Sequence, residues 1–159
     1  MDEKILRLHL VNLLNGNEAH ITFDKVTKDY PFDIVCMEAP GMPYTAWQIM
    51  EHMRIAQWDI LNFSISSEHV SPDFPDGYWP EKATPNQEQD WIDSVDIFKA
   101  ELEEMKNLAR NPEVDLFAPI PHGTGQTILR EINVVADHNS YHLGQLMLIK
   151  KMFQVSPSH

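Results

Sequence analysis

The chain has 159 residues, of which 43% are hydrophobic, 24 are acidic and 12 are lysine or arginine, so its formal net charge is -12. This length suits one globular unit with its own core, and we expect residues 1–159 to form a single domain. The negative charge repels phosphate backbones and anionic lipid headgroups alike. We therefore expect neither nucleic acid nor a membrane surface to be a partner.

The sequence predicts a cytoplasmic location. Cys36 is the only cysteine, so no internal disulfide can form, and residues 1–4 lack the basic stretch and apolar run of a signal peptide. No segment approaches the roughly 18 uninterrupted apolar residues of a membrane span. Cys36 has no basic neighbour that would lower its pKa, which favours a semi-buried hydrophobe over a nucleophile.

Apolar residues recur at helical spacing in four segments, which are separated by stretches rich in proline and turn formers. The first helical element is predicted from about Asp2 to Tyr30, with a kink or break at residues 15–17 and an end at Pro31. Its apolar positions are Leu6, Leu10, Leu13, Ala19, Phe23, Val26 and Tyr30.

The second helix is predicted to begin after Pro43 and to run to about Ser64. Thr45 and Gln48 have the spacing of a capping box, in which each side chain bonds the backbone N–H of the other residue. The apolar stripe of this helix consists of Ala46, Ile49, Met53, Ala56, Ile60 and Phe63.

The third helix is predicted to begin with Thr84 as N-cap, Pro85 at the first helical position and Gln87 at the capping-box position. It is expected to end near Asn111 and Pro112, because proline disfavours helix in the residue before it. Its apolar seam consists of Trp91, Val95, Phe98, Leu102 and Met105.

The fourth helix is predicted to start within residues 124–127 and to run to about Phe153. Asn139 and His142 interrupt its apolar seam. Polar groups at core positions either are satisfied there or perform a function. The remaining seam residues are Ile128, Ile132, Val135, Leu146, Ile149 and Phe153.

No strand-like alternation of useful length occurs, so we expect an all-α four-helix bundle. Roughly 20 residues join the second and third helices, far more than a tight helix hairpin needs. This connection is expected to cross the bundle, so that the two helices run parallel. It contains the aromatic residues Phe74, Tyr78 and Trp79, and it either covers a pocket mouth or serves as an ordinary bundle cap.

Three histidines form a candidate metal site. His138 and His142 are four residues apart on the fourth predicted helix, so both side chains lie on one face, about 5–6 Å apart. His52 lies beside the apolar stripe of the second helix. Because facing helices of bundles build metal sites in the interior, the sequence predicts a divalent metal ion on these three imidazoles. Histidine ligands suit zinc, nickel or ferrous iron, and three of them leave a position open for water or substrate.

Four further residues are candidates for the same pocket. Gln48, Asp59 and Gln145 lie within two helical turns of a predicted ligand and can orient an imidazole through its other nitrogen, although Gln48 is equally explained as a cap. His20 reaches the level of His52 if the first two helices are antiparallel neighbours, as a fourth ligand or a hydrogen bonder.

The remaining histidines and Glu51 are weaker candidates for the site. His122 can reach the pocket from a loop, whereas His9, His69 and His159 are expected to be solvated. Glu51 points about 100° away from its neighbour His52 around the helix, which argues against a role as general base.

Residues 46–61 and 136–146 resemble the two histidine motifs of the DinB/YfiT-like superfamily, and residues 19–24, 75–80 and 121–127 are similar to other segments of that family. The resemblance extends over nearly the whole chain. It implies a four-helix bundle, often a homodimer, whose metal is held by one histidine of the second helix and two of the fourth. These correspond to His52, His138 and His142.

The resemblance also implies an activity on a small-molecule substrate. Family members with assigned activities include thiol-dependent transferases and isomerases that use bacillithiol, mycothiol or glutathione. We therefore expect a metal-dependent enzyme that activates either a low-molecular-weight thiol for S-transfer or water for hydrolysis. Two alternatives stay open: a non-catalytic stress-response protein that binds a metal or a small ligand, and a helical protein whose buried histidines bind no metal.

Overall fold

The computed structural model describes residues 3–154, and this part of the chain is all-helical and contains no β-strand. The prediction of an all-α fold is confirmed. More helices are present than the four predicted, because the N-terminal region contains short ones. The elements in chain order are α1 (Glu3–Asn15), α2 (Phe23–Thr27), α3 (Phe32–Val35), α4 (Ala46–Ile65), the short 3-10 helix η1 (Asp76–Tyr78), α5 (Glu88–Arg110) and α6 (Ile128–Gln154).

The predicted kink or break at residues 15–17 is confirmed as a break, whereas the prediction of one helical element over residues 2–30 is wrong, because α1 ends there and two short helices follow. Gly16 adopts the left-handed conformation (φ 64°) and its N–H bonds the carbonyl of Asn12 at 3.2 Å, which is how a helix commonly ends. A Cβ at this position would lie 2.7 Å from the His20 ring. Thr22 then caps α2, and α3 follows Pro31.

The capping box at the start of α4 is confirmed. The Thr45 hydroxyl accepts the N–H of Gln48 at 3.2 Å, and the Gln48 side-chain oxygen accepts the N–H of Thr45 at 3.0 Å. The predicted start of the third helix at Thr84 is wrong. Helix α5 begins later because Gln87 and Asp90 form the capping box, with the Asp90 carboxylate accepting the Gln87 N–H.

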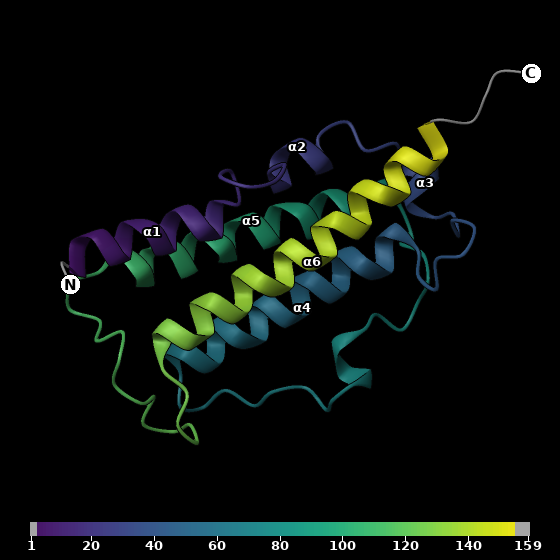
Figure 1. The fold of residues 1–159 in the computed structure, drawn as a ribbon. Helices are drawn as coiled ribbons and strands as arrows, with labels where there is room; N and C mark the ends of the chain where they lie inside the picture. Colours follow the sequence, from purple (N-terminus) through teal and green to yellow (C-terminus); the bar gives the residue numbers. More distant parts are fainter. Residues whose placement is uncertain (1–2, 155–159) are drawn as a thin grey trace, which may run out of the picture.

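Helices α4 and α6 pack side by side (Figure 1). Helix α5 contacts both of them, and α1 contacts α5 and α6. The predicted apolar seams of α5 and α6 are buried between these helices, apart from the partly buried Phe153. In α1 the predicted Leu10 is buried, but Leu14 is buried in place of the predicted Leu13, which is 45% exposed. The core therefore lies among α1, α4, α5 and α6, and the histidines lie where α4 faces α6.

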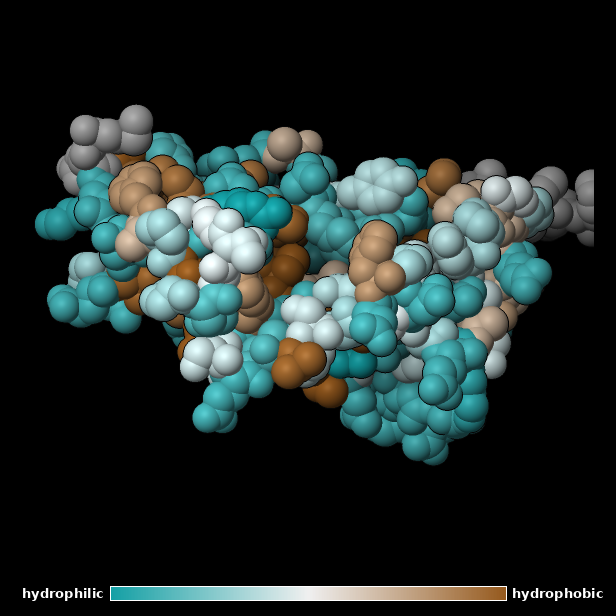
Figure 2. Space-filling view, turned by 90° about the horizontal axis from the view of Figure 1, so that it is seen from below, coloured by the Kyte–Doolittle hydropathy of each residue, from teal (hydrophilic) through white to brown (hydrophobic). Residues whose placement is uncertain are grey.

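The connection between α4 and α5 covers residues 66–87. Figure 1 shows it running back along the molecule, so that α5 begins near the end at which α4 begins. Val70 and Phe74 in this connection are 83% and 86% exposed, whereas Tyr78 and Trp79 are half-buried. Hydrophilic residues cover most of the face shown in Figure 2, with hydrophobic ones in small groups among them. In residues 3–154, no helix combines the length and apolar character that crossing a membrane requires.

Candidate metal centre

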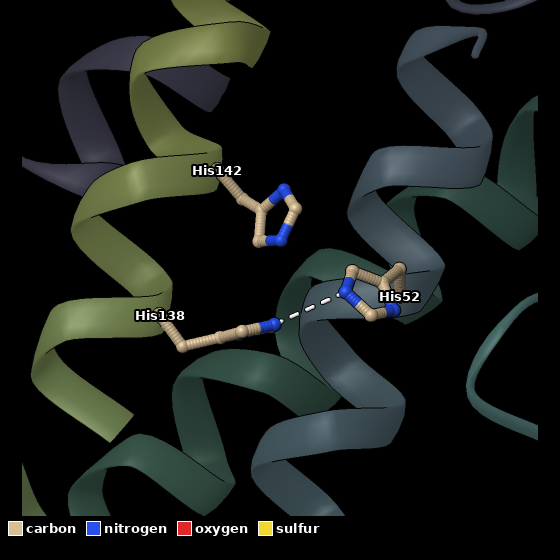
Figure 3. Close-up of side chains that lie close together, drawn as sticks. All are labelled: His52, His138 and His142. Atoms are coloured by element: carbon tan, nitrogen blue, oxygen red, sulfur yellow. Dashed lines mark hydrogen bonds between the residues drawn. The ribbon is translucent and has the colours of Figure 1, made fainter. Parts of the chain in front are cut away.

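The structure brings His52, His138 and His142 together. His52 projects from α4, and the other two project from successive turns of α6 towards it (Figure 3). One ring nitrogen from each lies within 4.8 Å of the others. His142 is buried, while His52 and His138 are half-buried. Within residues 3–154, this is the one group of three or more histidine, cysteine or acidic side chains close enough together to hold a metal ion.

Hydrogen bonds to carbonyl oxygens orient two of the three rings. His52 Nδ1 donates to the backbone carbonyl of Tyr78 at 2.8 Å, and His142 Nδ1 donates to the side-chain carbonyl of Gln145 at 2.7 Å. A neutral imidazole that carries its proton on Nδ1 presents a lone pair on Nε2. His52 Nε2 lies 3.0 Å from Nε2 of His138, so it faces the centre of the cluster. Such carbonyl partners are typical of metal-binding histidines.

The surroundings of the rings favour their neutral forms. Burial, followed by charge repulsion from the neighbouring His142 and His52, lowers the pKa of His138 to about 3. Burial also lowers the pKa values of His52 and His142, against the opposing effect of their hydrogen bonds to Tyr78 and Gln145. Because a metal binds only deprotonated imidazole nitrogen, these shifts keep the nitrogens available to a cation.

The donor set fits a divalent metal ion. Two nitrogen ligands at about 2.0–2.1 Å from one tetrahedral zinc are about 3.4 Å apart, close to the 3.0 Å between Nε2 of His52 and Nε2 of His138. The three ring nitrogens as a set lie within 4.8 Å of one another, which is farther apart than zinc ligands are. Rotation about χ2, which is broad for histidine, can bring them closer. The three histidines could therefore bind a metal ion, and nitrogen ligands alone do not specify which one.

Trp79 covers one face of the cluster, and it was not among the predicted site residues. Its ring stacks on His52 with centroids 4.1 Å apart and planes 4° apart, and Tyr44 stacks on Trp79 at 4.1 Å. The available sequence signal was the run of aromatic residues within a proline-rich connection. The Tyr78 carbonyl that holds His52 has no sequence signal, because every residue carries a backbone carbonyl.

Among the four predicted pocket residues, the structure brings only Gln145 to the cluster. Gln48 caps α4 through Thr45. Asp59 lies two helical turns beyond His52 and bonds Tyr78 and His69 rather than an imidazole of the cluster. His20 is exposed, and its ring nitrogens lie 2.9 Å from the Ile21 carbonyl and 3.0 Å from the Ser140 hydroxyl, so it does not join the set.

The expected solvation of His69 is wrong, because Asp59 holds it in a buried position with 8% of its side chain exposed. His122 contacts the Phe63 carbonyl at 2.7 Å instead of the cluster. His9 is exposed as expected, and His159 lies outside the described residues. Glu51 turns away from His52 and forms an ion pair with Arg54.

Cys36, the only cysteine of the chain, is not part of the histidine cluster. Cys36 is half-buried just after α3, and burial, followed by the charge of Asp33, raises the pKa of its thiol. A raised pKa reduces the thiolate fraction, which agrees with the interpretation of Cys36 as a small hydrophobe.

A surface groove of about 460 Å³ reaches the cluster at His138. All of its lining residues belong to α6, and they are Arg130, Asn133, Val134, Asp137, His138 and Tyr141. Tyr141 is 66% exposed, and its ring lies edge-on to His142 with centroids 4.8 Å apart. Of the three histidines, only His138 lines this groove.

No family model, curated protein or solved structure matches this chain.

Proposed function

We propose that the protein is a metal-dependent enzyme of the DinB/YfiT-like kind, which holds one divalent ion on His52, His138 and His142 and acts on a small molecule. The observation that carries this proposal is the convergence of three neutral imidazoles. Two of them donate a hydrogen bond through Nδ1, so that Nε2 is left to bind the ion. We propose zinc or nickel as the ion, with ferrous iron as the next choice; all three accept imidazole ligands.

The proposed architecture is the four-helix bundle of that family, built from α1, α4, α5 and α6 with a long crossover between α4 and α5. The contacts among these helices and the path of residues 66–87 support it. In this architecture the site lies between the second and fourth long helices, and a homodimer is the assembly that the family resemblance suggests.

The side chains around the site suit an open centre with one accessible side. A divalent ion held there supplies Lewis acidity, which lowers the pKa of a water or a low-molecular-weight thiol that it binds. Tyr78 and Gln145 orient the imidazoles, and Trp79 shields His52 from solvent on one face. The groove beside His138 admits the substrate. We propose thiol-dependent S-transfer as the first reaction class and hydrolysis as the second.

A second candidate function is metal or small-ligand binding without catalysis, as in a stress-response protein. The observation that favours it is the engagement of the carboxylates on α4: Glu51 pairs with Arg54, and Asp59 bonds His69 and Tyr78. Neither is available as a general base. Asp137 lines the groove and is the one acidic residue there.

Metal content tests the site first. Protein purified without a metal-chelating tag is expected to carry a divalent metal at one ion per chain, and His52→Ala is expected to lose it. Unchanged metal content in the variant would exclude this ligand set. Turnover is then measured with metal-replete protein, using bacillithiol, glutathione and other thiols against alkylating electrophiles, alongside ester and amide substrates. Activity in the thiol reactions supports transfer, and inactivity across both panels supports binding alone.

A further inference from the structure

The connection between α4 and α5 holds His52 from two sides. The Tyr78 carbonyl accepts the proton of His52 Nδ1 at 2.8 Å, and the Trp79 ring lies nearly parallel on the face of the same imidazole. Tyr44, just before α4, stacks on Trp79 with planes 21° apart. An edge and a face of the His52 ring are therefore fixed by residues that are distant in sequence.

A carboxylate of α4 also holds this connection, at two positions. Asp59 Oδ2 accepts the Tyr78 hydroxyl at 2.6 Å, and Asp59 Oδ1 lies 2.7 Å from His69 Nε2. The side chains of Asp59 and His69 are only 10% and 8% exposed. Because buried hydrogen bonds to an ionised group are stronger than neutral ones, Asp59 is a firm attachment point at two positions of the connection.

We propose that residues 69–79 form a positioning strap for His52, with Asp59 as its anchor. The anchor fixes Tyr78, and the Tyr78 carbonyl then sets the tautomer and the direction of the His52 ring, so that Nε2 faces His138. Asp59 is thus a positioning residue that acts on His52 through Tyr78. The relevance of the strap to metal binding rests on the proposed function, whereas its effect on the His52 ring does not.

The physical reason for such a strap is the freedom of the imidazole. The χ2 angle of histidine is broad, and its two neutral tautomers are close in energy, so an isolated ring on a helix surface presents either nitrogen. His142 obtains its orientation locally from Gln145, one turn along α6. His52 has no such partner on α4, and the strap supplies it.

Two conservative variants test the anchor. Asp59→Asn removes the charge and one of the two acceptors, and Tyr78→Phe removes only the hydroxyl while it keeps the carbonyl that His52 uses. The matched controls are Asp76→Asn, an exposed aspartate of the same connection, and Tyr44→Phe, the neighbouring aromatic residue of the stack. Circular dichroism confirms that each variant is folded.

Three measurements are made on each protein. Hydrogen exchange of residues 69–79 and the ring ¹⁵N chemical shifts of His52 are recorded on metal-free protein, with the His52 signals assigned by comparison with His52→Gln. Zinc affinity is then measured by competition with a chromophoric chelator. Asp59→Asn is expected to speed exchange in the strap, to shift the His52 ring nitrogens towards a mixture of tautomers and to weaken zinc binding about 10-fold or more. Tyr78→Phe should act in the same direction, and both controls should match the wild-type protein.

The outcomes separate the strap from the metal site. If exchange in the strap rises while the His52 shifts stay at their wild-type values, the strap does not position His52 and the inference is overturned. If the wild-type protein binds no zinc, nickel or iron, the proposed function fails, yet the His52 shifts of metal-free protein still decide the strap. If Asp59→Asn does not fold, the same measurements on Tyr78→Phe decide it, because that variant loses a single hydroxyl group.

Discussion

Helix α4 has one polar cluster where it packs on α5 and another where it packs on α6. The two clusters differ in how their polar atoms are paired. Towards α5, Glu51 accepts two hydrogen bonds from Arg54 and one from Ser94. Towards α6, His52 faces His138 and His142. In the first cluster carboxylate acceptors are paired with donors, whereas in the second one ring nitrogen from each of three histidines converges on the others.

This difference separates a structural cluster from a binding site. A paired buried network contributes to stability and to the specificity of packing, and it offers nothing to a ligand. Convergent nitrogens of neutral imidazoles stabilise the fold little, but as deprotonated ligands they match a cation. We therefore expect substitutions in the α5-facing cluster to change stability and those in the α6-facing cluster to change metal binding.

The largest expected effect is on metal affinity. His138→Ala removes one of three proposed ligands, so zinc affinity should fall more than 100-fold, beyond the range of changes to groups around the ligands. The free energy of unfolding of metal-free protein at neutral pH should change much less than the free energy of zinc binding. The reason is that the ring removed is only half-buried and has a strongly depressed pKa. Competition titration and urea unfolding measure the two quantities. His9→Ala, an exposed histidine of α1, is the control, and equal affinities for the two variants would remove the distinction between the clusters.

The opposite pattern is expected for Arg54→Ala. This change leaves Glu51, with 12% of its side chain exposed, without its cation, so the free energy of unfolding should fall by about 2 kcal/mol. Metal affinity should stay within about 3-fold of wild type, because Arg54 does not contact the imidazoles. Urea unfolding provides the measurement. Arg110→Ala breaks an exposed pair with Glu103 and should cost less than about 1 kcal/mol.

The sequence predicts the ligand set more readily than the groups that orient it. The spacing of His138 and His142 places them on one helical face, and the burial of the seam around them points that face inwards, so the convergence could be inferred from periodicity. Gln145 could be inferred for the same reason, since it is one turn from its partner. The Tyr78 carbonyl could not, because its position depends on the path of the whole connection and on Asp59.

The errors in the fold have a similar origin. Thr84 and Pro85 have the expected residue types for a helix start, but the reciprocal bonds of Gln87 and Asp90 fix the start of α5 further along. The apolar positions around Gly16 continue the helical spacing, yet the left-handed backbone of this glycine ends α1. Apolar periodicity reports which residues become buried, whereas caps and glycines decide where each helix stops. Both errors lie outside the histidine cluster.

Glu101 gives the α5-facing interface a pH dependence. Burial raises the pKa of this carboxyl to about 7, against the attraction of Arg54. Since the pKa is higher in the folded state than in the unfolded state, the folded protein binds more protons between about pH 4.5 and pH 7, and stability is lost as the pH rises through that window. Glu101→Gln mimics the protonated form, so it should be more stable than wild type by about 1–2 kcal/mol near pH 8 and equal to it near pH 4.5.

Unfolding at a series of pH values checks this expectation, with Glu104→Gln on the exposed side of α5 as the control. A constant difference between Glu101→Gln and wild type at every pH would mean that Glu101 does not titrate in this window. Zinc affinity of Glu101→Gln, measured at one fixed pH, should equal that of wild type. A changed affinity would show that the two interfaces of α4 are coupled.

The smallest change in stability is expected at Gln48. For this residue the sequence and the structure suggest different roles, and one substitution distinguishes them. Gln48 was a candidate to orient His52, but its side-chain oxygen accepts the Thr45 N–H at the start of α4. Gln48→Ala should therefore lower the free energy of unfolding by about 1 kcal/mol, the usual cost of losing a cap, and leave zinc affinity unchanged. Gln48→Glu keeps the acceptor and should restore the stability. If Gln48→Ala instead weakened zinc binding, Gln48 would belong to the site, and its assignment as a cap alone would be wrong.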